Sequence, residues 1–224
     1  MRVIWHELRK TGAVKELNIK TRRPLRDIAE IEEYVAQRAE VVIATSKIVA
    51  DELIESGTAK EKVHIIHNAI EDFWFQNGAA GNSSAPPSLV YLGRLGRDVF
   101  TLKLKGFDRL VWLYRKYPKV PKMTIAMTTN TRLIEWFSSA IPEHAMHTNL
   151  LKIIIYEKLK NMRGSILIIP SRYEGFCLSM IEGMSQGLVP IVFPVGVAPE
   201  IIENGVNGFL VNSENEMKEA VDKL

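Results

Sequence analysis

The sequence is poor in cysteine, in net charge and in long hydrophobic runs. One cysteine, Cys177, in 224 residues excludes an intramolecular disulfide and fits a reducing compartment. No apolar run approaches the roughly 18 residues of a membrane-spanning helix, and the first residues do not have the pattern of a signal peptide. A net charge of +3 is too small to indicate nucleic-acid binding. These absences predict a cytoplasmic protein without nucleic acid among its partners.

The hydrophobic content of 46% is enough to build the core of one large or two small domains. The stretch from Gln76 to Ser88, QNGAAGNSSAPPS, has no charge and no large apolar side chain, which is typical of a linker. We therefore expect a partial N-terminal α/β domain over residues 1–75, a linker over residues 76–87 and a second α/β domain over residues 88–224.

The N-terminal part has the pattern of a small α/β unit. Its strand candidates are Val3 to Trp5, Glu40 to Thr45 and Val63 to His67, with Ser46 as the N-cap of a helix between the last two. Pro24 is expected to begin a helix whose buried stripe is Leu25, Ile28, Ile31 and Val35. The span from Arg9 to Arg26 has seven basic residues and one acid, as a solvated loop or a surface for anionic headgroups would; the solvated loop is the more common case.

In the second part, strands are expected at Leu89 to Leu92, Met123 to Met127 and Leu150 to Ile155, and helices from Phe107, over Thr131 to Ala140 and over Glu214 to Leu224. His144 and His147 are three residues apart, but no Cys or further His joins them. We interpret them as loop histidines instead of metal ligands.

One later stretch has the order strand, loop, helix, strand. The apolar run Ile166 to Ile169 predicts a strand buried on both faces, and Val189 to Phe193 predicts the next strand. Between them lie a polar loop with Glu174 and Gly175 and a helical segment that ends near Gly187. In such a βαβ unit the loop lies at the carboxyl end of a parallel strand, where open α/β sheets bind ligands.

The chemistry of this loop suits a phosphorylated ligand with hydroxyl groups. Gly175 allows the backbone to approach a ligand closely, and the amides of Phe176, Cys177 and Leu178 at the helix start would bind phosphate oxygens. Glu174 and Glu182 would flank the ligand and accept hydrogen bonds from hydroxyls. An isolated pair of glutamates is more often a pair of solvated charges.

The stretch from Glu174 to Val211, EGFCLSMIEGMSQGLVPIVFPVGVAPEIIENGVNGFLV, strongly resembles the donor-site signature of retaining glycosyltransferases of the GT-B fold, family 4 (glycosyl transferases group 1). Glu174 and Glu182 fit the Glu-x7-Glu motif of that family. Upstream, Gly93-Arg94-Leu95 and Lys105-Gly106 resemble the segment whose Arg and Lys grip the donor diphosphate. Lys103 competes with Lys105 for the lysine role, and Lys105 is preferred because Gly106 follows it.

The resemblance implies an α/β protein with a Rossmann-type C-terminal donor domain. Its activity would be transfer of a hexose from a nucleoside-diphosphate sugar to an unknown acceptor, with retention of configuration and no metal or cofactor. Glu174 would contact the transferred sugar and Glu182 the ribose, while Arg94 and Lys105 would hold the diphosphate. His6 ends the first strand candidate, where the family often has a histidine near the reacting sugar, so Glu174 and His6 are the catalytic candidates. The nucleotide base would be read near Tyr156.

Two alternatives stay open. Instead of a transferase, the chain would be either a nucleotide-sugar-binding module without its own activity or an epimerase of the same fold. The three strand candidates before the linker would also leave a sheet edge uncovered. We therefore expect a second copy of the chain, a separate acceptor-binding subunit or a peripheral membrane contact to cover it.

Overall fold

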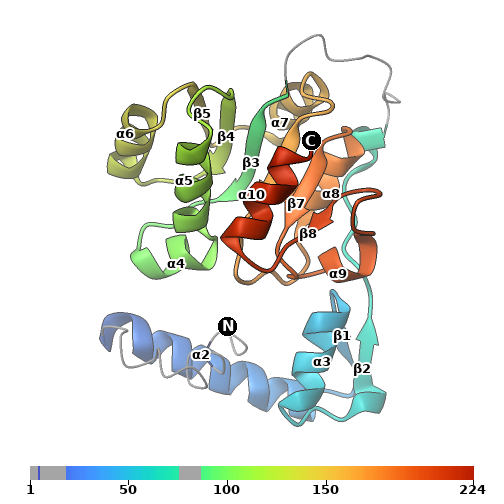
Figure 1. Cartoon of the computed structure of the whole chain (residues 1–224). Helices are drawn as coiled ribbons and strands as arrows, with labels where there is room; N and C mark the ends of the chain where they lie inside the picture. The colour runs from blue at the N-terminus through green and yellow to red at the C-terminus, as the bar shows by residue number, and fades with distance from the viewer. Residues whose placement is uncertain (1–4, 6–18, 76–86) are drawn as a thin grey trace. The chain divides into compact units, whose positions relative to one another are not determined.

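The computed structural model describes residue 5, residues 19–75 and residues 87–224 (Figure 1). The chain divides into two compact units, Met1–His67 and Asn68–Leu224. His6, most of the first strand candidate and residues 76–86 of the expected linker lie outside the described residues. Trp5 is described as helical and buried, instead of as the end of a strand. No helix in the described ranges is long and apolar enough to cross a membrane.

The first unit contains a two-stranded parallel sheet. Its elements are α2 (Ile19–Arg38), β1 (Val42–Ala44), α3 (Lys47–Glu55), the 3-10 helix η2 (Lys60–Lys62) and β2 (Val63–Ile65). β1 pairs with β2 in parallel, and α3 packs on both strands. Ser46 caps α3 by accepting a hydrogen bond from the amide of Val49, which confirms the predicted helix start.

The helix α2 differs from the prediction in its start and in its buried face. It begins at Ile19 and includes Pro24, and its buried residues are Leu25, Ala29 and Ala36. The larger Ile28, Ile31 and Val35 are exposed by 40%, 62% and 56%. Leu25, Ala29 and Ala36 keep the helical spacing of a single face. Leu25 of the predicted stripe is buried as expected, but Ile28, Ile31 and Val35 are not, because the sequence pattern gave more weight to large aliphatic residues than to the alanines.

The second unit is a doubly wound α/β domain. Its strands are β3 (Leu89–Arg94), β4 (Lys122–Met127), β5 (His144–Thr148), β6 (Ile166–Ile169), β7 (Val189–Val192) and β8 (Phe209–Leu210). They form one parallel sheet in the order β5-β4-β3-β6-β7-β8. Its helices are η3 (Asp72–Phe75), α4 (Val99–Leu104), α5 (Phe107–Lys116), α6 (Thr131–Ala140), α7 (Lys152–Lys160), α8 (Leu178–Ser185), α9 (Ala198–Ile201) and α10 (Glu214–Asp222). The strand order reverses between β3 and β6, which confirms the predicted fold class.

The central strands are buried on both faces, as in other parallel sheets covered by helices. All four residues of β6 are buried. Gly183 of α8 packs so closely on this strand that an added Cβ would lie 2.5 Å from the Leu167 side chain. On the other face, α5 lies beside α10 in front of the sheet (Figure 1). The aromatic rings of Phe107 and Tyr114 on α5 pack against Phe137 of α6.

The predicted strand from Leu150 to Ile155 is wrong. Residues from Lys152 onward form α7, and the edge strand is β5, which contains both His144 and His147. The side chain of His144 bonds Thr124 of β4 at 2.9 Å and is not in a loop. The run of isoleucines has the β-branched content of a strand, but Tyr156 and Leu159 are buried at helical spacing.

The boundary between the units also differs from the prediction, which assigned residues 68–75 to the first domain. In the structure these residues belong to the second unit. Trp74 is 1% exposed and packs edge-on against Tyr156 of α7, while its carbonyl accepts a hydrogen bond from Gln186 at 2.9 Å. Trp74 and the neighbouring Phe73, which also packs on Tyr156, attach this segment to the core of the second unit.

Candidate functional site

A cavity of about 600 Å³ lies within the second unit at the carboxyl ends of the strands. Its walls include Gly93 and Arg94 from the end of β3, Ala126 from β4 and Ile169 from β6. β3 and β6 are the two strands between which the direction of winding reverses. Open α/β sheets bind ligands at this point, because the loops on either side turn away to opposite faces and leave a crevice.

The structure brings most of the sequence-predicted residues together in this cavity. Gly175 is adjacent to it in the chain but is not part of its wall, and His6 lies outside the described residues. The predicted residues that line the cavity are Arg94, Lys105, Glu174, Phe176, Cys177, Leu178 and Glu182.

Lys105 and Glu174 form an ion pair at the mouth of the cavity. The ammonium nitrogen of Lys105 lies 2.7 Å and 2.8 Å from the two carboxylate oxygens of Glu174. The hydroxyl of Ser171 donates a further hydrogen bond of 2.7 Å to Glu174. The two side chains are exposed by 26% and 16%, so the pair is shielded from water more than a surface ion pair is. The carboxylate is therefore held in one orientation.

The glycine after Lys105 explains how this lysine reaches the loop. Gly106 has φ of +67°, and an added Cβ would lie 1.9 Å from the carbonyl oxygen of Pro170. The start of α5 therefore approaches the end of β6 as closely as only glycine permits. Arg172 reinforces the approach, since its guanidinium makes two hydrogen bonds of 2.7 Å and 2.8 Å to the carboxylate of Asp108.

The start of α8 forms the floor of the cavity. Cys177 is its N-cap residue, with φ of +83°, and its side chain is 4% exposed. Burial, followed by the nearby Glu174 carboxylate, raises the pKa of the Cys177 thiol to about 12, so it is protonated near neutral pH. The preceding carbonyl of Phe176 accepts a hydrogen bond from the amide of Val197 at 2.9 Å. The first amides of the helix have no partner within it, and this end of a helix favours anions.

Glu182 lies one turn further along α8 and is buried, with 8% exposure. Burial raises the pKa of its carboxyl above the ordinary value, and the positive charge of Lys152 acts in the opposite direction. The Lys152 nitrogen lies 3.8 Å from Glu182 and 2.5 Å from Glu71. A buried carboxylate in a cavity wall is suited to accept hydrogen bonds from ligand hydroxyls.

The residues from the end of β5 to the start of α7 were not predicted as part of the site. Asn149, Leu150 and Lys152 line the cavity, whereas Tyr156, where base reading was expected, is buried in α7. Asn149 has φ of +54°, and its side-chain amide bonds both the amide and the carbonyl of Thr128. An asparagine after a strand is a signal for this conformation. It was overlooked because the strand itself was assigned to later residues.

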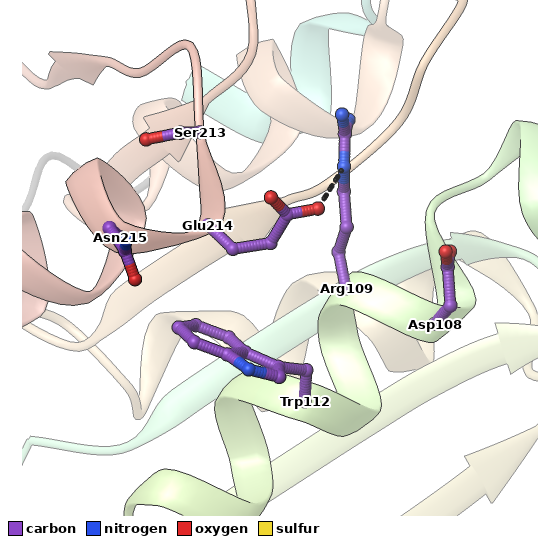
Figure 2. A pocket seen from close by; sticks show the side chains of 6 residues that line it. All are labelled: Asp108, Arg109, Trp112, Ser213, Glu214 and Asn215. Carbon is purple, nitrogen blue, oxygen red and sulfur yellow. Dashed lines mark hydrogen bonds and ion pairs between the residues drawn. The ribbon is translucent and has the colours of Figure 1, made fainter.

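The described part of the chain contains no group of three His, Cys, Asp or Glu side chains that could hold a metal ion. A second cavity of about 380 Å³ lies between α5 and α10 and contains none of the predicted residues (Figure 2). Arg109 bonds Glu214 at 3.1 Å across it, and its guanidinium also lies 3.8 Å from the centre of the Phe193 ring. These contacts join α10 to α5 and the sheet, which is a structural role.

Comparisons with known proteins agree with this geometry. A protein-family model described as glycosyl transferases group 1 matches residues 147–224. The chain is 23% identical over 198 residues to an uncharacterised glycosyltransferase of Methanocaldococcus jannaschii, covering 85% of this chain and 51% of that protein. It is 39% identical over 70 residues to sucrose synthase 5 of Arabidopsis thaliana, covering 31% of this chain and 8% of that protein. The chain spans about half the length of the first curated relatives, 51% and 52%.

Solved structures show the same fold. Sucrose-phosphate synthase from Thermosynechococcus elongatus has a TM-score of 0.67 at 20% identity, over 87% of this chain and 51% of that one. The Anabaena protein HepE, solved in complex with UDP-glucose, has a TM-score of 0.65 at 19% identity, over 87% of this chain and 56% of that one. Residues 147–224 therefore match the glycosyl transferases group 1, and the chain has the GT-B fold of glycosyltransferases.

Proposed function

We propose that the protein transfers a hexose from a nucleoside-diphosphate sugar to the hydroxyl group of an acceptor, with retention of configuration. The observation that carries the proposal is the gathering of seven predicted site residues, six for donor binding and the catalytic candidate Glu174, around one cavity of about 600 Å³ at the switch point of the sheet. A cavity of this size fits a nucleotide sugar, since small-molecule sites have volumes of about 300–1,000 Å³.

The diphosphate would lie between Arg94, Lys105 and the start of α8. Both cations line the cavity together with Cys177 and Leu178 at the beginning of that helix. Two positive side chains and the helix end would balance the charge that develops on the departing diphosphate. This arrangement does the work that a divalent cation does in other enzymes, so we expect donor binding without a metal.

The ion pair of Lys105 and Glu174 would join the diphosphate to the transferred sugar. An ammonium group has three donors, and two of those of Lys105 point to the oxygens of Glu174. The third donor remains for a phosphate oxygen. The carboxylate of Glu174, already oriented by Ser171, would then accept a hydrogen bond from a sugar hydroxyl and stabilise positive charge on the ring.

The buried carboxylate of Glu182 would bind the ribose hydroxyls at the other end of the cavity. Retention is expected from front-face attack, in which the donor diphosphate itself helps to remove the proton of the acceptor hydroxyl. In that step the bond from the anomeric carbon to the diphosphate oxygen breaks, the bond to the acceptor oxygen forms on the same face, and the proton goes to the diphosphate.

Calorimetry with UDP-glucose, UDP-galactose, GDP-mannose and ADP-glucose in the presence of EDTA tests the proposal. We expect one of these donors to bind, and Lys105→Ala to weaken it roughly ten- to a hundred-fold, because a hydrogen bond to a charged group contributes about 1.5–3 kcal/mol. Lys103→Ala is the matched control and should bind normally, because Lys103 does not line the cavity.

Loss of donor binding in the presence of EDTA, or an affinity that Lys105→Ala does not change, would contradict the assignment of the diphosphate site. Incubation of the bound donor with and without candidate acceptors, followed by NMR of the anomeric proton, then identifies the reaction. A retained anomer on the acceptor supports the transferase. Conversion of the free donor without an acceptor would indicate an epimerase, and binding without any product would indicate a binding module.

A further inference from the structure

The wall of the cavity near Glu182 contains a lysine that the sequence motif does not include. Lys152 is the first residue of α7, and its ammonium nitrogen lies 3.8 Å from Glu182 and 2.5 Å from Glu71. A cation in the first turn of a helix is unfavourable, because the helix dipole is positive at that end. The acidic partners of Lys152 offset this unfavourable interaction.

Glu71 connects this lysine to a buried residue, Trp74. One carboxylate oxygen of Glu71 bonds Lys152, and the other accepts a hydrogen bond of 3.1 Å from the indole nitrogen of Trp74. Trp74 is itself buried, and its carbonyl accepts a hydrogen bond from Gln186 of α8. The contacts form a continuous series from α8 through the segment before β3 to α7, and return to α8 at Glu182. The Lys152–Glu71 pair itself is half exposed, by 52% and 45%, so its position depends on the attachment of Glu71 to the buried Trp74.

We propose that Lys152 is a positioning residue for the nucleoside end of the cavity: held by Glu71, it sets a positive charge against Glu182 so that this carboxylate stays ionised and accepts hydrogen bonds from the ribose. The inference rests on the proposed function, since it names the ribose as the ligand of Glu182. It adds a residue that lies outside the Glu-x7-Glu motif.

The charges around Glu182 support this assignment. Burial raises the pKa of its carboxyl, the ammonium of Lys152 lowers it, and the carboxylate of Glu71 raises it. Of the strands that pack on α8, β6 and β7 have no titratable side chain and β3 has Tyr91 and Arg94; the packed η3 has Asp72. Among the groups that act on Glu182, Lys152 is the one that favours its charged form.

The proposal is tested by measuring the affinity for UDP-glucose between pH 5 and pH 9. If GDP-mannose binds instead, its affinity is measured over the same range. The diphosphate of either sugar is a diester and does not titrate in this range. Binding requires the ionised carboxylate and is lost as the pH falls through the pKa of Glu182. Lys152→Met keeps the aliphatic stem and removes the charge, so the pKa of Glu182 should rise. The loss of affinity should then begin roughly one pH unit higher than in the unaltered protein. At pH values below the pKa in both proteins, the variant should bind about ten-fold more weakly.

Lys152→Arg keeps the positive charge and should restore the normal pH profile. Lys158→Met is the matched control on α7, because Lys158 lies near His147 and outside the cavity. The pH dependence of affinity in this variant should therefore be unchanged. Loss of affinity by the same factor at every pH, or an unchanged midpoint in Lys152→Met, would overturn the proposal.

A second measurement separates this proposal from the proposed function. The carboxyl carbon of Glu182 can be titrated by NMR in the ligand-free protein and in Lys152→Met. A higher pKa in the variant supports the role of Lys152 even if no nucleotide sugar on the panel binds, which would overturn only the proposed function. An equal pKa in both proteins overturns the role of Lys152 whatever binds.

Discussion

The two glutamates of the motif have different surroundings in the structure. Glu174 is paired with Lys105 and Ser171 at the mouth of the cavity, whereas Glu182 is buried beside Lys152. Their seven-residue separation places one in the loop and the other on the helix, so they reach different parts of the same cavity. This difference predicts that the two carboxylates recognise different parts of the donor.

Glu182→Gln is expected to weaken the binding of the plain nucleoside diphosphate and of the nucleotide sugar equally, by roughly ten-fold or more, because the ribose is common to both. Glu174→Gln should spare the nucleoside diphosphate and weaken only the sugar-bearing ligand. Calorimetry of both ligands with both variants measures the difference. Equal effects of the two substitutions on the two ligands would show that the assignment is wrong.

At the scale of single residues, the sequence predicted the local part of the site. Glu174, Cys177 and Leu178 lie within one loop and helix start, so one motif identifies them together. Lys152 and Glu71 reach Glu182 through the fold, from 30 and 111 positions earlier in the chain. No local pattern indicates such contacts, because the burial of Trp74 that brings Glu71 there is a tertiary effect.

At the scale of elements, the strands of the second unit were predicted well where a continuous apolar run ends at a turn residue. β6 and α6 have the predicted bounds, and α5 begins at the predicted Phe107. The edge strand β5, HAMHT, contains two histidines and was missed because its middle is weakly apolar. Edge strands are half covered, so composition marks them less clearly than central strands.

The junction between Lys105 and α5 gives an element-scale prediction. Gly106→Ala should destabilise the protein through a positive φ and through a clash with the Pro170 carbonyl, and it should weaken donor binding because Lys105 must move. Gly205→Ala is the matched control: Gly205 also has a positive φ, of +81°, but an added Cβ meets nothing within 4 Å. The unfolding free energy of Gly205→Ala should fall by about 1–2 kcal/mol, from the strain of the left-handed backbone conformation alone.

Urea unfolding followed by circular dichroism measures both variants. The loss of unfolding free energy in Gly106→Ala should exceed that in Gly205→Ala, since only the first adds a backbone clash. If the two variants lose equal stability and bind the donor equally, the close approach of α5 to the end of β6 does not position Lys105.

At the scale of the whole molecule, the cavity and its supporting contacts lie within the second unit. The residues that line it extend from Asn68 to Glu182, and none of the described residues of Met1–His67 is among them. The position of the boundary therefore decides which fragment keeps the site. The composition of residues 76–87 indicated a linker, but the burial of Trp74 places the preceding segment with the core of the second unit.

A fragment of residues 68–224 is therefore expected to fold and to bind the nucleotide sugar with the affinity of the full chain. A fragment of residues 88–224, cut at the linker that the sequence predicted, loses Trp74 and Glu71. Removing a buried tryptophan costs about 3–5 kcal/mol, a large part of the 5–15 kcal/mol that stabilises a typical domain. Trp74→Ala in the longer fragment is the matched control for this loss. Urea unfolding and calorimetry compare the three proteins, and equal stability of the two fragments would place the boundary at the linker after all.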